Sequence, residues 1–438
     1  MDLKLMNVGK IRQADIKMNG LTVIAGLNDS GKSTIGKVLF VTIKALVNTL
    51  HRSSNNKERI LLEQISTLYE RIGELRFKSE QLNHMMPITI EAMGRKLLAM
   101  ENLESRQNYL NDIINIISKE ELTPRVRSLI MTDLSKINST LNENSRFYDI
   151  KTEINDLLES EFLGSFTTVG EETSEVTLMM EDGKSNLYYK VKENKTDTAS
   201  VTGQEIFLDD VTCVESSLYL HMLQSILRSR KMPEADPMVM ARGLLPEHIV
   251  DMAEKIHSAS RRMTVADKTA AEMNLAKIID GKFAFDPNSG SLKFQRNEVS
   301  FPVMNVASGI KSFGVIQMLL ENGIISNNRL LEWDEPENHM HPEWQLNLAE
   351  VMIQLTKAGY PILITTHSPY FLQALRYFAA MYDVEKFVDY YLAEPAKDNA
   401  ATCVVREVTD TLNDVFITLA EPLNRVLNVD QARKKEAE

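Results

Sequence analysis

Cysteine is scarce in this chain, since only Cys213 and Cys403 occur among 438 residues. Neither stands in a metal-ligand spacing, and two distant thiols make no disulfide framework, so we expect reduced cytosolic cysteines. Long apolar runs are also missing, because no stretch approaches 18 uninterrupted apolar residues. The first residues, Met1–Met6, are too few and too charged for a signal peptide. The sequence therefore predicts no transmembrane helix, no membrane contact and a cytoplasmic protein.

Positive charge is in deficit, with a formal net charge of -12 and a pI of about 5.4. This excludes a protein that coats nucleic acid with a uniformly basic surface, although a local basic groove is compatible with it. With 43% hydrophobic residues, the chain can bury a large core. Its length predicts two structural units, of which one is an insertion into the other.

The first 50 residues have the pattern strand, turn, strand, loop, helix. Residues 3–8 and 14–18 alternate apolar and polar positions, and 21–25 form a short apolar run typical of a buried strand. Glycine and small polar residues follow, and residues 35–50 have helical periodicity. This is a β–loop–α unit.

From about residue 57 the chain changes to a heptad-like spacing of apolar residues, interrupted at Pro87 and Pro124. We predict helices over about 57–85, 90–117 and from 130 onward, packed as a compact arm rather than a long coiled coil. Strand patterns return at 176–180 and 187–191, joined through Asp182-Gly183, and at 211–214. Residues 216–280 are predicted to be mainly helical. After Phe283 strands and helices alternate again, so both flanks form one α/β sheet domain.

Residues 26–34 fit the phosphate-loop pattern G-x-x-x-x-G-K-[ST]. Gly26 and Gly31 let successive N–H groups turn toward a β-phosphate. Lys32 brings a cation to the β- and γ-oxygens, the Ser33 hydroxyl ligates Mg²⁺, and the following helix directs its N-terminal dipole at the anion. A glycine-containing turn is the alternative, but strand and helix supply the required context. The predicted phosphate-binding residues are Gly26, Asn28, Asp29, Ser30, Gly31, Lys32, Ser33 and Thr34.

A second element is the run 330–336, an apolar-biased strand that ends in adjacent carboxylates. Asp334 is predicted to reach the Mg²⁺ shell, and Glu335 to orient or deprotonate the attacking water. The alternative is a strand that runs into an acidic turn. Glu332 departs from the pattern, since a strand buried on both faces should not carry it; an edge position or a partner cation would accommodate it.

Two further elements carry polar groups. The apolar strand 362–366 delivers His367 at its carboxyl end, where a neutral imidazole can contact a γ-phosphate or the attacking water. Ser308-Gly309, with Lys311 close behind, starts a helix over 313–320 and offers a second anion-binding N-terminus. For this pair alone we favour a plain N-cap formed by Ser308, without a ligand.

The order and spacing of these four elements resemble the head of an ABC-type ATPase of the OLD/RecF/SMC-like branch. Residues 334–342, Asp-Glu-Pro-Glu-Asn-His-Met-His-Pro, resemble the "DEPE-x-x-L-H-P" of stand-alone bacterial ATPases of that branch, with Met340 in place of leucine. Residues 366–372 resemble their "THSP-x-F-L". The resemblance covers 1–50 and 280–430 in detail and includes ATPase subunits of anti-phage systems (PtuA-like and AriA-like proteins).

The resemblance implies an α/β head with a mixed or parallel sheet that binds ATP and Mg²⁺ between two subunits facing head to tail. Ser308 and Gly309 of one copy would touch the γ-phosphate held by Lys32 of the other, and Asn338 would lie in the segment that crosses the interface. The signature lacks the second glycine and the glutamine of transporter heads. In this sequence we identify neither the glutamine that senses Mg²⁺ in such heads nor an aromatic side chain that would contact the adenine.

We therefore expect the ATPase head to begin in 1–55, a helical arm to be inserted at 56–165, and a β-hairpin part of the head to follow at 166–215. A mainly helical segment is expected in 216–280, and the C-terminal part of the head in 281–430. The tail, 431–438, is expected to be a helix end or disordered.

The sequence distinguishes between several functions that are compatible with an ABC-type ATPase head. A transporter ATPase keeps Walker A and signature far closer together, and a long-arm SMC protein needs continuous heptads that the prolines forbid. Too few residues follow His367, and they contain no D-x-D pair, so we expect no intrinsic nuclease domain. The preferred hypothesis is an ATPase that senses or scaffolds in an anti-phage complex, with a separate effector, a nuclease or toxin. The alternative is a RecF/SMC-like DNA-repair ATPase that clamps DNA.

Overall fold

The computed structural model describes residues 1–100, 103–120, 122–142, 150–180, 183–203, 208–229, 245–259, 270–286, 291–413, 415–419 and 421. The chain divides into two compact units. The first comprises Met1–Ala45 and Ile150–Glu438, and the second comprises Leu46–Asp149. The predicted tail 431–438 and Asp182 of the predicted hairpin turn lie outside the described residues.

The first unit is built on an 11-stranded sheet in the order β6-β5-β4-β1-β2-β14-β13-β3-β12-β11-β7. In chain order the strands are β1 (Asp2–Val8), β2 (Ile11–Lys17), β3 (Leu21–Gly26), β4 (Thr173–Met180), β5 (Ser185–Lys192), β6 (Lys195–Thr202), β7 (Asp210–Val214), β11 (Arg329–Asp334), β12 (Ile362–Thr366), β13 (Val388–Pro395) and β14 (Cys403–Glu407). A separate three-stranded sheet holds β8 (Lys282–Phe285), β9 (Leu292–Arg296) and β10 (Val299–Pro302).

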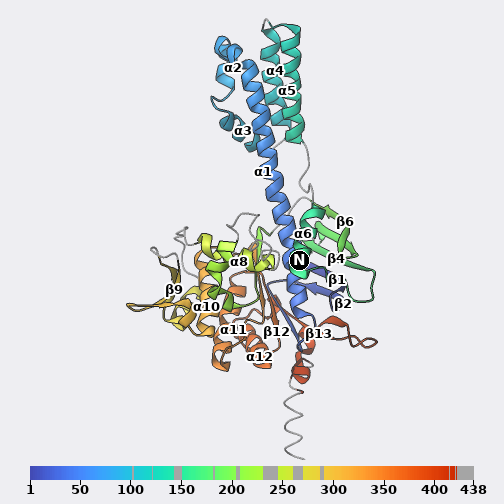
Figure 1. The fold of residues 1–438 in the computed structure, drawn as a ribbon, viewed down its shortest axis with the longest axis vertical. Helices are drawn as coiled ribbons and strands as arrows, with labels where there is room; N and C mark the ends of the chain where they lie inside the picture. Colours follow the sequence, from blue (N-terminus) through green and yellow to red (C-terminus); the bar gives the residue numbers. More distant parts are fainter. Residues whose placement is uncertain are drawn as a thin grey trace, which may run out of the picture. The chain divides into compact units, whose positions relative to one another are not determined.

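The large sheet has two halves with different pairing. Strands β13, β3, β12, β11 and β7 run parallel, whereas β2, β1, β4, β5 and β6 pair antiparallel as a meander. Strand β14 joins the halves, antiparallel to β13 and parallel to β2. Figure 1 shows β1, β2, β4 and β6 together on one flank of the unit. The predicted α/β fold with a mixed sheet is confirmed.

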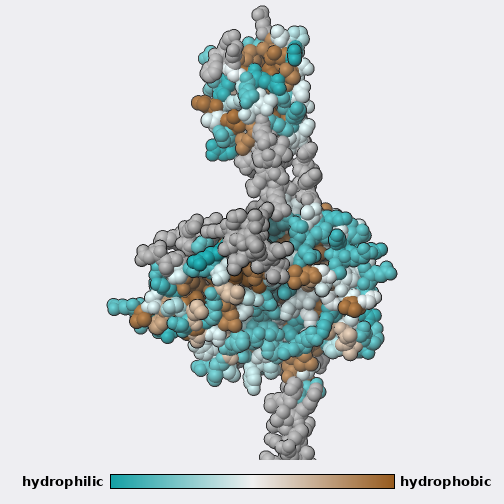
Figure 2. Space-filling model, in the orientation of Figure 1, coloured by the Kyte–Doolittle hydropathy of each residue, from teal (hydrophilic) through white to brown (hydrophobic). Residues whose placement is uncertain are grey.

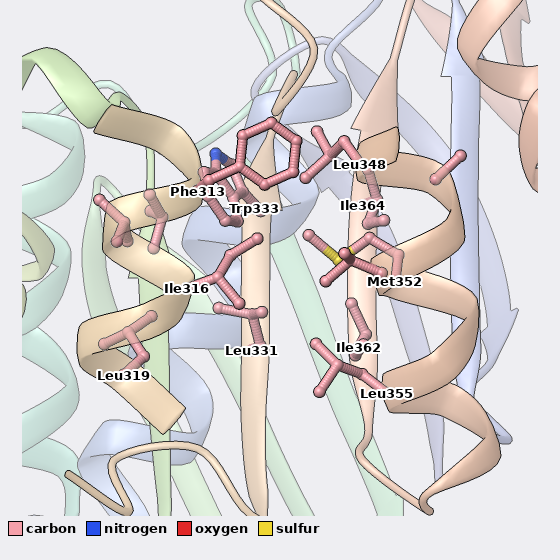
Figure 3. Close-up of a cluster of buried hydrophobic side chains, with 14 of the residues drawn as sticks. Phe313, Ile316, Leu319, Leu331, Trp333, Leu348, Met352, Leu355, Ile362 and Ile364 are labelled. Carbon is pink, nitrogen blue, oxygen red and sulfur yellow. The ribbon is translucent and has the colours of Figure 1, made fainter. Parts of the chain in front are cut away.

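Helices pack against both halves of the large sheet. In the first unit they are α6 (Ile150–Phe162), α7 (Leu223–Ser229), α8 (Glu247–Ala259), α9 (Ala270–Ile279), α10 (Ser308–Glu321), α11 (Pro342–Lys357) and α12 (Pro369–Met381). Figure 3 shows Phe313, Ile316 and Leu319 of α10 facing Leu331 and Trp333 of β11, while Met352 of α11 faces Ile362 and Ile364 of β12. Because β3 and β12 are buried at every position, both read as continuous apolar runs in the sequence.

The second unit consists of the distal part of α1 (Lys32–Lys78) with α2 (Glu80–Met85), α3 (Ile90–Ala99), α4 (Leu103–Lys119) and α5 (Pro124–Asn142). Its own core contains the predicted apolar stripe, for example Leu61, Ile65, Leu68 and Ile72. Two helix predictions are wrong. Helix α1 is continuous where we predicted two helices, and the predicted helix 90–117 is two helices, because the chain turns to extended backbone at Met100.

Other differences concern the strands. The predicted pairing of 176–180 with 187–191 is confirmed as β4 with β5. Strand β2 begins at Ile11 rather than Ala14, after a tight turn at Gly9 and Lys10 in which Gly9 has a positive φ. The edge strand β6 was not predicted. Its apolar positions are few and its burial irregular, so it lacks the alternation that identified its neighbours.

One helical stretch, Lys32–Leu50, is long and apolar enough by length and composition to cross a membrane. In its most apolar segment of 18 residues, 67% is buried inside the protein. The stretch begins at the lysine of the phosphate loop, so we interpret it as the core helix of the sheet. On the visible face of the first unit, hydrophilic residues predominate and apolar ones form small groups (Figure 2).

Neither explanation offered for Glu332 is correct. Its strand, β11, lies between β12 and β7, not at an edge, the side chain is 1% exposed, and no ion pair joins it to a cation among the described residues. Instead, burial raises the pKa of Glu332 to about 8, so the carboxyl is neutral at pH 7. Helix α1 makes room for it at Gly36, where a Cβ would lie 2.1 Å from Glu332 Oε1.

A second buried polar group, His248 of α8, lies between two carboxylates. Its Nδ1 is 2.7 Å from Glu161 of α6, and its Nε2 is 3.0 Å from Glu215 after β7. Phe40 of α1 packs edge-on against the ring, and Lys37 faces Glu215. Although burial lowers the histidine pKa, the hydrogen bonds to both carboxylates raise it to about 9. The histidine is therefore a buried cation in the folded state.

This arrangement predicts a pH-dependent stability. Because the folded pKa of about 9 exceeds the unfolded value of about 6.5, the contribution of His248 is complete below pH 6.5 and is lost as the pH rises through 9. We expect the free energy of unfolding, measured with urea, to fall by up to about 3 kcal/mol over this window. His248→Gln should flatten the slope, whereas His84→Gln at an exposed position should keep it. An unchanged slope in His248→Gln contradicts the assignment.

Candidate functional site

The phosphate loop lies at the carboxyl end of β3, between that strand and α1. Gly31 has a φ of +81° and Asp29 a φ of +66°. A Cβ on Gly26 would lie 2.7 Å from the Ala393 carbonyl oxygen and 2.8 Å from Ser30 Oγ. The glycines at both ends of the loop are therefore required by the backbone itself. Helix α1 begins at Lys32, so its N-terminal N–H groups face the loop.

The lysine and the serine of the loop have different surroundings. The Lys32 side chain is 4% exposed, its ammonium donates to the Leu27 carbonyl at 2.9 Å, and it lies 3.6 Å from Glu335 Oε1. Ser33 is exposed, and its hydroxyl donates to Asp334 Oδ2 at 2.8 Å. The loop and the end of β11, separated by about three hundred residues of chain, are thus in direct contact.

Asp334 and Glu335 leave β11 in different environments. Asp334 accepts hydrogen bonds from the hydroxyls of Ser33 and Thr365, and burial raises its pKa. Glu335 has a φ of +45°, and its amide donates to Thr365 Oγ1 at 3.0 Å. A non-glycine residue in this region of φ is a strained conformation often found at functional sites.

His367, at the end of β12, completes the group. Its Nδ1 lies 3.0 Å from Glu335 Oε1, and Asn338 donates to Glu335 Oε2 at 2.9 Å. The His367 contact, with Asn338 and Lys32 in support, lowers the pKa of Glu335 to about 2. The same contact raises the pKa of His367. The carboxylate is therefore ionised throughout the physiological range.

A pocket of about 790 Å³ opens over the phosphate loop, Asp334 and Glu335, and His367 is not among its described lining residues. Part of its lining was predicted: Asn28, Asp29, Ser30, Gly31, Lys32, Ser33, Thr34, Asp334 and Glu335. The remaining lining residues were not predicted: Gly9, Lys10, Gly164, Ser165, Thr167, Val169 and Asn194. Among the described lining residues none is aromatic, in keeping with the lack of an obvious adenine platform.

One side chain and several backbone contacts hold the unpredicted wall, among them the bond from the Gly9 amide to the Phe166 carbonyl at 2.7 Å. Asn194, in the turn between β5 and β6, accepts hydrogen bonds from the amides of Phe166 and Thr167 at 3.1 Å each. Lys10, in the turn between β1 and β2, forms an ion pair with Asp29. These residues carry no motif, and only the sheet order β6-β5-β4-β1-β2 brings them to the pocket.

The predicted signature residues do not line this pocket. Ala307, not Ser308, is the N-cap of α10, so the N-cap interpretation of Ser308 is wrong. The Ser308 hydroxyl donates to the His339 carbonyl at 3.2 Å. Gly309 packs against Trp344, where a Cβ would lie 3.0 Å from the indole. Lys311 is 3% exposed, and burial lowers its pKa.

The residues present fit a nucleotide with a magnesium ion. Among the described residues no group of three His, Cys, Asp or Glu side chains could hold a metal alone. Instead two hard oxygen donors, Ser33 Oγ and an Asp334 carboxylate, lie 2.8 Å apart beside the phosphate loop. This is the donor set expected when substrate phosphates and water complete the coordination of Mg²⁺.

Fold and site together define a P-loop ATPase. Residues 1–372 match the family described as AAA ATPase domain, and the chain belongs to that family. No curated protein matches the chain.

Solved structures of SMC heads are similar at a low level. An SMC head bound to the C-winged helix domain of ScpA has 10% identity and a TM-score of 0.40, over 93% of this chain and 96% of the other. The SMC head domain of Thermotoga maritima has 8% identity and a TM-score of 0.37, over 93% and 98%. An Smc head with an extended coiled coil, bound to the C-terminal domain of ScpA derived from Pyrococcus furiosus, has 10% identity and a TM-score of 0.39, over 98% of each chain. Similarity at this level gives no information on partners.

The two lysines of the pocket should differ in their contribution to nucleotide binding. Removing the buried Lys32 cation in Lys32→Ala is expected to weaken the binding of a fluorescent ATP analogue by about 10- to 100-fold. Lys10→Ala removes an exposed cation already paired with Asp29, so its effect should stay within about threefold. Equal dissociation constants for the two variants would contradict the roles given to these lysines.

Proposed function

We propose that the chain hydrolyses ATP at this edge of the sheet, with Ser33 and Asp334 holding Mg²⁺ and Glu335 and His367 acting on the attacking water. The observation that carries the proposal is the convergence of Ser33, Asp334, Glu335 and His367 through contacts of 2.8–3.0 Å. A bound magnesium ion would neutralise developing charge on the phosphate oxygens.

The chain's own groups have distinct tasks in this proposal. The ionised Glu335 accepts a hydrogen bond from the attacking water and orients it. With a pKa of about 2 it is a weak base in the nucleotide-free arrangement, so orientation is its main contribution there. His367 holds the carboxylate at 3.0 Å and offers its ring to the transferred phosphoryl group. Lys32, released from the Leu27 carbonyl, would neutralise the phosphate oxygens.

We further propose that two copies pair head to tail around ATP, with Ser308 and Gly309 of one copy completing the site of the other. Two features support this. Ser308 lies outside the pocket lining of its own chain, and its hydroxyl is tied to the carbonyl of His339, in the turn that follows Glu335. An intact site would then need a second molecule, so hydrolysis would report on pairing.

The biological role that we propose is sensor or scaffold in a cytoplasmic anti-phage complex whose damage is done by a separate effector, a nuclease or toxin. The residues that support it are the run 334–342 and the run 366–372, which resemble stand-alone ATPases of such systems. The RecF/SMC-like alternative predicts instead that DNA stimulates the ATPase.

The central test is Glu335→Gln, which keeps the size of the side chain but removes the charge. We expect ATP turnover to fall at least about 100-fold, ATP to remain bound, and the protein to elute as an ATP-dependent dimer in size-exclusion chromatography with light scattering. Glu385→Gln, at an exposed glutamate before β13, is the matched control and should behave as wild type. Normal turnover in Glu335→Gln would show that the assignment is wrong.

The defence role is tested with the same variant in a host that carries the gene with its genomic neighbours. Wild type should reduce the plating efficiency of at least one phage, and Glu335→Gln should abolish the reduction. Unchanged plating in every case, together with DNA-stimulated ATPase activity, would favour the DNA-clamp alternative.

A further inference from the structure

A buried carboxyl lies directly behind the catalytic edge. The turn after β11 (335–340) and the turn after β12 (366–368) touch at two points. The outer contact joins His367 and Glu335 at 3.0 Å. The inner contact joins Glu337 and Thr366, which are 2% and 0% exposed.

Both members of the inner contact, Thr366 and Glu337, take part in further hydrogen bonds. The Thr366 hydroxyl donates to Glu337 Oε1 and accepts from the Ser368 amide at 3.0 Å. Glu337 also fixes its own turn, because its carbonyl accepts from the Met340 amide at 3.1 Å. Thr366 and Ser368 flank His367 in sequence, so the backbone on both sides of the histidine is held by one hydroxyl and one carboxyl.

Such a carboxyl is costly to bury. In the described structure Glu337 Oε2 has no hydrogen-bond partner, and burial raises the pKa of Glu337 to about 7. An apolar side chain of similar size would fill this position at lower cost. A half-satisfied buried acid at a turn therefore indicates a task other than stability.

The two turns carry Glu335 and His367, and their relative position indicates the task of Glu337. Glu335 is held at a φ of +45°, and its partner His367 is the residue directly after Thr366. A shift of the second turn by about 1 Å would break the 3.0 Å contact, and misplacements of this size cost about 100-fold in rate. We propose that Glu337 is a positioning residue, which acts through Thr366 to hold His367 beside Glu335. The proposal rests on the ATPase mechanism proposed above.

The experiment compares two uncharged variants that differ in the acceptor. Glu337→Gln keeps an oxygen for the Thr366 hydroxyl, and Glu337→Ala removes it. We expect kcat to fall at least tenfold in Glu337→Ala but to stay within about threefold of wild type in Glu337→Gln. The dissociation constant for ATP, which depends on the phosphate loop, should change less than twofold in both.

A double variant separates positioning from general weakening. If Glu337 acts through His367, adding Glu337→Ala to His367→Ala should cost no further activity. Full additivity of the two losses overturns the proposal, as does a kcat in Glu337→Ala equal to that of wild type. Should Glu337→Ala fail to fold, Thr366→Val and Thr366→Ser repeat the comparison from the donor side, and only the serine should keep the rate.

A second readout does not depend on turnover. The NMR titration of His367, assigned with His367→Ala, reports its contact with Glu335. Its raised pKa should return toward the ordinary value in Glu337→Ala but not in Glu337→Gln, since both variants lack the charge. Equal titration in the two variants overturns the proposal. If wild type hydrolyses no ATP, the ATPase mechanism fails, and this titration still decides whether Glu337 positions His367.

Discussion

The parallel pairing of β3, β12 and β11 is the constraint on which the site depends. Register places Ile364 beside Val23 and Trp333 beside Ile364, so the three strands end at the same edge. The residues that follow them are then neighbours whatever their distance in sequence: the phosphate loop, His367 and the pair Asp334–Glu335. The hydrogen bond from Ser33 to Asp334 follows from this register, and a slip of one residue would turn Asp334 to the other face.

The same edge concentrates polar groups that a stable core would avoid. Lys32, Glu332 and Glu337 are each less than 5% exposed, and Glu335 adopts a positive φ. The fold tolerates them because the apolar layers on both sides are extensive, with β3 and β12 buried at every position. Charge is also kept low by burial itself, since the pKa values of Glu332 and Glu337 are raised to about 8 and about 7. The interior of the sheet thus provides the stability, and the reactive groups lie at its carboxyl end.

The sequence predicted the parts of the site that lie in one continuous stretch of chain. The loop 26–34, the carboxylates after 333 and His367 each follow an apolar run that is recognisable as a buried strand. What escaped prediction depends on contacts between distant segments. Asn194 and Lys10 line the pocket only because their strands are brought together by the sheet order β6-β5-β4-β1-β2. Glu332 is tolerated only because Gly36 of another element leaves space. Helix boundaries were also misplaced: a break was predicted at 50–57, where α1 is continuous, and none was predicted at Met100, where α3 ends.

The proposed hydrolysis depends most directly on Ser33 and Asp334 sharing one metal ion with the nucleotide. Electron paramagnetic resonance of Mn²⁺, added to the protein with a non-hydrolysable ATP analogue, measures this without any turnover. We predict one Mn²⁺ bound per chain only when the nucleotide is present, with an affinity at least about tenfold lower in Ser33→Ala. Mn²⁺ that binds equally without nucleotide, or with unchanged affinity in Ser33→Ala, would contradict the account.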